Sequence, residues 1–272
     1  MRVREALADA AARLAGLSDT PRLDAELLMA EALGGTREAL LLSGLDDQAP
    51  ATFPSLLARR EGGEPIAYII GRRAFWTIEL EVGPGVLIPR PDSETLIEAA
   101  IAHFGRDGPK TILDLGTGSG ALLLAALDQW PGACGTGIDA SDAALAIARA
   151  NAQRLGLAGR ATFRNGDWTT GLDDRFDLIL CNPPYVEASA ALPRDVVQWE
   201  PHKALFAGAD GLDAYRRLAP ALGAVLAPRG IACIEIGAGR FAAVKSLFET
   251  QPFIISSRTD LIGHCRCITV AA

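Results

Sequence analysis

From residue 111 onward, apolar segments of strand length alternate with segments of helical periodicity. The strands are expected at 111–115, 134–138, 161–164, 176–181 and 231–236, and the helices at 119–129, 141–154, 213–226 and 240–249. Such alternation predicts a mostly parallel sheet covered by helices on both faces. Two final strands near 253–258 and 265–270 have no helix between them. The sequence therefore predicts a seven-stranded α/β sheet that ends in an antiparallel hairpin.

The chain before this sheet has a different pattern. Residues 1–70 are expected to form a small helical domain, with Thr20-Pro21 as the start of one helix and Gly34-Gly35 as its end. Residues 71–92 are expected to be a β-hairpin linker that turns at Gly83-Pro84-Gly85. Residues 93–272 would then be the catalytic domain. The helical domain is either a packing element or a recognition module for a macromolecular substrate.

A glycine-rich turn, Gly116-Thr117-Gly118-Ser119-Gly120, follows the first expected strand of the sheet. Open α/β sheets bind their ligands at this edge, and glycines let the backbone turn sharply and approach a ligand closely. Asp139 ends the next strand, where an acid can accept hydrogen bonds from ribose hydroxyls. We therefore expect a nucleoside-containing ligand at this turn.

The glycine turn alone does not identify that ligand. With Ala121 it also fits a loose dinucleotide fingerprint. Asp114 precedes the glycines, which suits a ligand with a cationic amino group better than a pyrophosphate. After the third expected strand, Asp167 and Trp168 could hold the amine and the face of an adenine, or could form a simple turn with a packed ring.

The fourth expected strand runs into Asn182-Pro183-Pro184-Tyr185. Two successive prolines remove two N–H donors and stiffen the loop, while the carbonyls and the Asn182 side chain remain as acceptors. A planar, conjugated NH₂ group brings two donors and matches this loop. Holding both hydrogens would aim the nitrogen lone pair at a methyl donor, so the loop predicts N-methylation without a strong general base.

Composition excludes several other classes. A net charge of −7 disfavours a nucleic-acid-binding protein, because duplex binding needs clustered positive charge. The five cysteines and three histidines are scattered, so we expect reduced thiols and no metal site. No apolar run reaches about 18 residues, and the N-terminus does not read as a signal sequence. We expect a soluble, cytoplasmic protein that does not bind membranes.

The chain resembles the protein-(glutamine-N5) methyltransferases of the HemK/PrmC type over nearly its whole length. The resemblance covers the helical N-terminal segment, the glycine turn, Asp139, Trp168 and the loop from Asn182 to Tyr185. The stretch from Val86 to Glu94 is its most discriminating part, and Ser93 stands there where many relatives carry threonine.

The resemblance implies a Rossmann-like methyltransferase sheet and S-adenosyl-L-methionine as cofactor. It implies that Gly116 to Gly120 contact the cofactor, with Asp139 at the ribose and Trp168 at the adenine. Asn182 and Pro183 would accept hydrogen bonds from the substrate amide, beside Pro184 and Tyr185. Asn182, Pro183 and Tyr185 would be the catalytic residues, and Asn182 would also contact the cofactor. The implied substrate is the glutamine of the Gly-Gly-Gln loop in peptide chain release factors, and a monomer without stable nucleic-acid binding is expected.

Two alternatives use the same residues. An adenine-N6 methyltransferase acting on nucleic acid would need the same acceptor chemistry, since adenine also offers NH₂ on a flat ring. The net charge and the lack of a long inserted recognition region count against it. A non-enzymatic cofactor-binding protein would be expected to have a damaged acceptor loop, whereas Asn182 to Tyr185 is intact.

Overall fold

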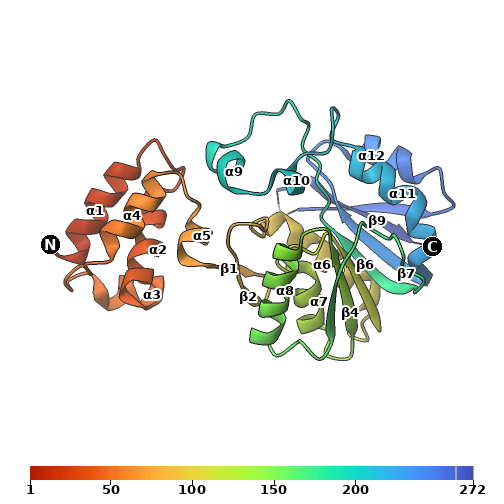
Figure 1. Ribbon diagram of the computed structural model, residues 1–272, viewed down its shortest axis with the longest axis horizontal. Coiled ribbons are helices and arrows are strands. Elements are labelled where there is room, and N and C mark those ends of the chain that lie inside the picture. Colours follow the sequence, from red (N-terminus) through yellow and green to blue (C-terminus); the bar gives the residue numbers. More distant parts are fainter. Residues whose placement is uncertain (261, 272) are drawn as a thin grey trace. The chain divides into compact units, whose positions relative to one another are not determined.

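The computed structural model describes residues 1–260 and 262–271, which divide into two compact units (Figure 1). The first unit consists of Met1–Arg72 together with Leu192–Trp199, and the second of Arg73–Ala191 together with Glu200–Ala272. The first unit thus includes a short segment from late in the chain, which a contiguous division at residue 70 does not foresee. In the described part of the chain, no helix combines the length and apolar character needed to cross a bilayer.

The first unit is helical. Pro21 occupies the first turn of one helix and Gly34 ends it in the left-handed conformation, as expected from the sequence. Leu7, Leu28 and Leu57 are fully buried in its core. Its elements are α1 (Val3–Leu14), α2 (Pro21–Leu33), α3 (Arg37–Ala39), the π-helical turn η1 (Leu40–Gly44), α4 (Phe53–Glu61), α5 (Ile66–Ile70) and α9 (Arg194–Trp199).

The second unit begins with a hairpin whose turn differs from the expected one. Strands β1 (Arg72–Phe75) and β2 (Ile78–Glu81) pair with each other, so the turn lies at residues 76–77. Within the described chain, residues 86–88 form no strand. The Ile88 N–H bonds the Glu200 side chain at 3.0 Å rather than a neighbouring strand. The expected turn at residues 83–85 is present, since Val86 N–H bonds the Gly83 carbonyl oxygen at 3.3 Å, but it does not join the two strands of the hairpin.

The predicted seven-stranded sheet is confirmed, in the order β5-β4-β3-β6-β7-β9-β8. The first five strands of this order are parallel, and β9 and β8 form the antiparallel hairpin. The strands are β3 (Thr111–Leu115), β4 (Cys134–Asp139), β5 (Ala161–Asn165), β6 (Phe176–Cys181), β7 (Leu226–Glu235), β8 (Ile254–Thr259) and β9 (Cys265–Ala271). Only β7 departs clearly from expectation, because it starts five residues early with an irregular pairing near Phe176.

Helices cover the sheet in two groups (Figure 1). In one group α6 contacts α7, which in turn contacts β3 and β4, while α8 contacts β4 and β5. In the other group α11 and α12 contact each other, and their Leu222 and Phe248 belong to the same buried core cluster as Ile179 and Ile234 of the sheet. These helices are η2 (Pro91–Ser93, a 3₁₀ turn), α6 (Glu94–Phe104), α7 (Ala121–Gln129), α8 (Asp142–Arg154), α10 (His202–Leu205), α11 (Asp213–Val225) and α12 (Phe241–Phe248).

The strand order reverses direction at β3, which lies between β4 and β6. Leu115, the last residue of β3, lies opposite Ile138 of β4 and Cys181 of β6. The glycine turn, the end of β4 and the asparagine–proline loop therefore meet at one edge of the sheet. Ligands of open α/β sheets bind at such a switch point, outside the carboxyl ends of the strands.

The packing of α7 on the sheet depends on Gly135 in β4. A Cβ at this position would lie 2.4 Å from Leu123 Cδ1 and 3.3 Å from the Ile112 carbonyl oxygen. We expect Gly135→Ala to lower the free energy of unfolding by about 1–3 kcal/mol, because an overpacked core must displace the helix. Gly132→Ala is the matched control, since its Cβ would meet nothing within 4 Å, and its effect should stay within about 0.5 kcal/mol. Chemical denaturation of both variants checks this, and equal stability would contradict it.

Candidate active site

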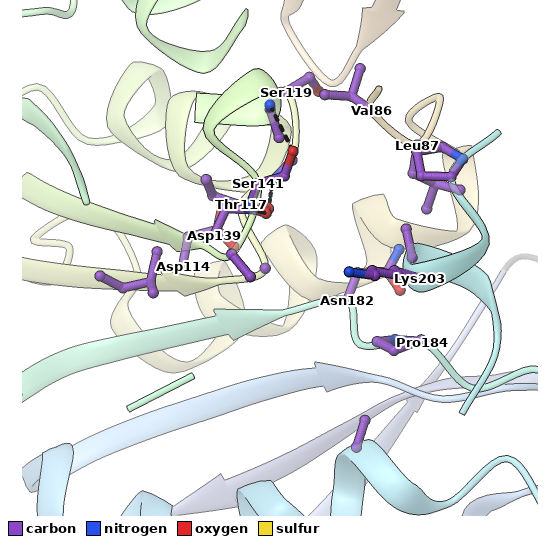
Figure 2. Close-up of a pocket in the computed structure, with 18 of the residues that line it drawn as sticks. Val86, Leu87, Asp114, Thr117, Ser119, Asp139, Ser141, Asn182, Pro184 and Lys203 are labelled. Atoms are coloured by element: carbon purple, nitrogen blue, oxygen red, sulfur yellow. Dashed lines mark hydrogen bonds between the residues drawn. The ribbon is translucent and has the colours of Figure 1, made fainter. Parts of the chain in front are cut away.

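A cavity of about 780 Å³ lies at the carboxyl ends of β3, β4, β5 and β6. Figure 2 shows Asp114, Thr117 and Asp139 on one side of it, and Asn182, Pro184 and Lys203 on the other. Val86 and Leu87 approach from the segment after the hairpin (Figure 2). The two loops singled out from the sequence thus face a common space.

The glycine turn forms a cradle with little side-chain bulk. Gly116 and Gly118 have φ angles of 71° and 55°, in the left-handed region that favours glycine. The N–H groups of Gly116 and Thr117 both bond the Ile138 carbonyl oxygen at 2.9 Å. A Cβ on Gly116 would meet nothing within 4 Å, so this glycine leaves room for a ligand beside the backbone.

Four residues of the turn, Gly116 to Ser119, line the cavity, whereas Gly120 is not among the lining residues. Gly120 has a φ of 84°, and a Cβ there would lie 2.9 Å from Leu124 Cδ1 and 3.4 Å from Ala148 Cβ. Close packing of the turn against α7 and α8 accounts for this glycine.

Asp139 links two loops at the cavity wall. One carboxylate oxygen accepts the Gly118 N–H at 2.9 Å, and the other accepts the Ser141 N–H at 2.8 Å. Each oxygen keeps acceptor capacity, because a carboxylate oxygen has two lone pairs. Asp139 can therefore hold the glycine turn and still accept hydroxyl groups of a ligand.

Asp114 is fully buried beneath the glycine turn. Its Oδ2 accepts the Thr117 hydroxyl at 2.6 Å and the Leu123 N–H at 3.3 Å. Its Oδ1 has no hydrogen-bond partner among the described residues, although the side chain lines the cavity. Burial raises the pKa of this carboxyl to about 7. A buried acceptor without a partner is costly, so this oxygen calls for a donor from a ligand.

Trp168 also lines the cavity, after β5. Its φ of 54° is unusual for a residue other than glycine, and its ring packs partly against the core. The neighbouring Asp167 lines the cavity as well, and its carboxylate forms an ion pair with Arg217. The ring is therefore held at the wall of the cavity, and the Asp167 carboxylate is already paired with an arginine.

The four residues of the acceptor loop divide into two pairs. Asn182 and Pro184 line the cavity, whereas Pro183 is buried and Tyr185 packs against the core beneath the loop. Asn182 Nδ2 donates to Ser93 Oγ at 3.0 Å. The Tyr185 hydroxyl donates to Glu235 Oε1 at 3.2 Å, and burial followed by the charge of Glu235 raises the pKa of this phenol well above its usual value.

Glu235 is the residue that the sequence interpretation did not single out. It ends β7, is 1% exposed, and also accepts the Ser93 hydroxyl. Burial raises the pKa of its carboxyl to about 7. The available signal was an acidic residue at the end of the apolar run Ile231 to Ile234, the same signal that marks Asp114 and Asp139.

A partly buried ion pair holds the remaining wall of the cavity. Glu200, 4% exposed, forms an ion pair with Arg90 and accepts the Ile88 N–H. This fixes the segment that carries Val86 and Leu87 at the cavity. No group of three or more potential metal ligands occurs among residues 1–260 and 262–271. The site thus offers the buried carboxylate of Asp114, the carboxylate of Asp139 with free acceptor capacity for hydroxyl groups, and the stiff loop from Asn182 to Tyr185 with its carbonyl acceptors.

Comparison with known proteins adds the following. Residues 5–71 match the model of the PrmC N-terminal domain, and residues 107–243 match that of a methyltransferase domain. The release factor glutamine methyltransferase of Caulobacter vibrioides is 45% identical over 92% of this chain and 89% of its own length. That of Cereibacter sphaeroides is 42% identical over 99% of this chain and 98% of its own.

Solved structures agree on the fold. A methyltransferase from Pyrococcus furiosus, 18% identical, aligns with a TM-score of 0.56 over 78% of this chain and 95% of its own. The ribosomal protein L11 methylase from Lactobacillus delbrueckii subsp. bulgaricus, 21% identical, aligns with a TM-score of 0.52 over 71% of this chain and 84% of its own.

Proposed function

This chain belongs to the release factor glutamine methyltransferase family, and we propose that it methylates the side-chain amide nitrogen (N5) of a release factor glutamine. The acceptor is the glutamine of the Gly-Gly-Gln loop. One observation carries the proposal: Asn182 faces the same cavity as the glycine turn, and its NH₂ group bonds Ser93. The amide oxygen of Asn182 is thereby left to accept a hydrogen bond from a substrate NH₂ group.

The enzyme uses S-adenosyl-L-methionine, and the residues present fit this cofactor. The unpartnered Oδ1 of Asp114 would accept the ammonium group, and Asp139 would accept the ribose hydroxyls. Gly116 to Ser119 would hold the amino-acid part by backbone contact, and Trp168 would flank the adenine. When bound, the cofactor supplies an electrophilic methyl group on a sulfonium.

The acceptor loop would prepare the amide nitrogen. The Asn182 side-chain oxygen and the Pro183 carbonyl accept its two hydrogens, and Pro184 contributes no competing N–H. Holding both hydrogens fixes the nitrogen, opposes its conjugation with the carbonyl and stabilises the positive charge that develops on it. Tyr185 supports this loop from beneath through its bond to Glu235.

The helical N-terminal domain, residues 1–70, would recognise the release factor, with residues 71–92 as the linker to the catalytic domain. Among the exposed large apolar side chains of the described residues in this domain, Leu42 is the most exposed, at 86%. The Leu42 side chain is therefore accessible for contact with a protein partner. A cytoplasmic monomer accords with a substrate that acts in translation.

The adenine-N6 alternative is not favoured. It would use the same acceptor loop, but the close relatives that cover nearly the whole chain are named for release factor glutamine. The net charge of −7 also gives no general attraction to nucleic acid.

Mass spectrometry of a release factor after incubation with enzyme and cofactor tests the proposal. The wild-type enzyme should add one methyl group to the glutamine of the Gly-Gly-Gln peptide. Asn182→Ala should abolish this product while cofactor affinity changes less than about threefold, because the asparagine contacts the acceptor. Methylation at another residue, or near-normal transfer by Asn182→Ala, would contradict the proposal.

The raised pKa of Asp114 predicts how cofactor affinity depends on pH. Only the ionised carboxylate pairs with the ammonium group, so affinity is full above pH 7 and declines as the pH falls through about 7. The Kd should rise about tenfold per pH unit below that point. The stability of the ligand-free protein changes in the opposite direction. Folding raises the pKa of this carboxyl, so its contribution to the free energy of unfolding falls as the pH rises and the protonated form is lost.

Calorimetric titration at several pH values measures this dependence. Asp114→Asn should bind weakly and show no such pH dependence. Asp174→Asn, at an exposed loop position, is the control that should behave as wild type. A wild-type Kd that is flat between pH 5.5 and about 8 would remove Asp114 from the cofactor site.

The role of the helical domain can be tested at Leu42. We expect Leu42→Asp to raise the KM for a whole release factor about tenfold and to leave kcat unchanged, since it removes apolar contact without touching the cavity. Ile254→Asp, at an equally apolar and 74% exposed position on β8, is the control. Equal KM values for both variants would make Leu42 irrelevant to recognition.

A further inference from the structure

Asn182 and Glu235 are neighbours because of strand register. Cys181 of β6 lies opposite Ile234 of the parallel strand β7, so the next residues of both strands sit side by side. Glu235 is 1% exposed, and two hydroxyl groups, those of Ser93 and Tyr185, donate to its two carboxylate oxygens. Asn182 Nδ2 donates in turn to Ser93 Oγ. Four side chains thus form one chain of hydrogen bonds beneath the acceptor loop.

The direction of these hydrogen bonds follows from counting protons. An ionised carboxylate can only accept, so Ser93 must give its single hydrogen to Glu235. Ser93 Oγ can then only accept from Asn182. An asparagine that reached Ser93 with its oxygen would place two acceptors against each other. The amide of Asn182 therefore turns its NH₂ group to Ser93 and its oxygen away from it.

We propose that Glu235 is a positioning residue that acts through Ser93 to set which end of the Asn182 amide meets the substrate. This inference rests on the proposed function, because a substrate NH₂ group requires an acceptor at Asn182. If the amide turned over, two NH₂ groups would face each other and the substrate nitrogen would lose its acceptor. Glu235 contacts no reacting atom, and it does not line the cavity.

The surroundings of Glu235 make its charge state sensitive to pH. Burial is the largest influence and raises the pKa of its carboxyl, the hydroxyl donors Ser93 and Tyr185 lower it, Asp92 raises it and Arg266 lowers it, with a net pKa of about 7. A protonated Glu235 could donate to Ser93, which would release the Ser93 hydrogen toward Asn182 and favour the reversed amide. The titratable or charged groups around it are those of Asp92, Cys181, Tyr185, Tyr215, Arg266 and Cys267.

Variants at both ends of the relay test the proposal. Ser93→Ala removes the link and should lower kcat for release factor methylation about tenfold or more, with cofactor Kd within about twofold. Ser93→Thr keeps the hydroxyl and should retain kcat within about threefold. Tyr215→Phe is the matched control, because the Tyr215 hydroxyl bonds only the backbone oxygen of Glu235, at 2.9 Å.

A double-mutant cycle separates positioning from simple structural support. If Glu235 acts through Ser93, Glu235→Gln should lower kcat in the wild-type background and have little further effect on Ser93→Ala. A fold-loss of kcat in the double variant that equals the product of the fold-losses in the two single variants would overturn the proposal. So would a Ser93→Ala enzyme with wild-type kcat, or a Ser93→Thr enzyme as slow as Ser93→Ala.

A second measurement does not need turnover. The side-chain NH₂ resonances of Asn182, observed by NMR of the whole protein, should shift in Ser93→Ala and in Glu235→Gln but stay in place in Tyr215→Phe. Unmoved resonances in the first two variants would overturn the positioning role. A wild-type enzyme that leaves release factor glutamine unmethylated would instead refute the proposed function, while the NMR result would still decide the relay.

Discussion

The parallel pairing of β3 with β6 is the constraint on which the rest of the site depends. Because Leu115 lies opposite Cys181, the glycine turn and the acceptor loop leave the sheet at the same level and face one cavity. A shift by one residue would turn every side chain of β6 to the other face. Ile112, Leu113, Leu178 and Ile179 are all fully buried, so such a shift would also disrupt close packing on both faces of the sheet. Hydrophobic packing thus sets the geometry in which transfer is proposed to occur.

Two buried carboxylates occupy comparable places at the ends of β3 and β7. Burial raises the pKa of both Asp114 and Glu235 to about 7. Their partners differ, and so do their proposed roles. Asp114 keeps one oxygen without a partner in the described chain and is suited to a cation, whereas Glu235 has a hydroxyl donor on each oxygen and orders the acceptor loop. Burial therefore raises the pKa of both carboxyls, but Asp114 is proposed to bind the cofactor and Glu235 to orient the group that meets the substrate.

Much of the fold could be predicted from periodicity, and the reason is physical. Strands buried on both faces are continuous apolar runs, and the helices between them repeat every three to four residues, so the order of elements is visible in the sequence. The turn at residues 83–85 is present, but no strand follows it, and Ile88 bonds a distant side chain, Glu200, rather than a neighbouring strand. A local sequence pattern does not indicate hydrogen-bond partners that are distant in the chain.

The candidate site was partly visible for the same reason. The glycine turn and the asparagine–proline loop are local motifs, and both line the cavity. Glu235 was missed because its importance comes from its register with Asn182, which depends on the pairing of β6 with β7. Ser93 stood out in the sequence only through the family resemblance of its segment, which does not show that its hydroxyl bonds Glu235 instead of the helix backbone.

The central claim is that Asn182 presents its side-chain oxygen to a substrate amide nitrogen at the cavity. A crystal structure with S-adenosylhomocysteine and a glutamine-containing release factor peptide measures this directly. The account predicts the glutamine nitrogen within hydrogen-bond distance of Asn182 Oδ1 and of the Pro183 carbonyl oxygen, with Asn182 Nδ2 still on Ser93. A glutamine nitrogen beyond the reach of both oxygens, or one that meets Asn182 Nδ2, would contradict it.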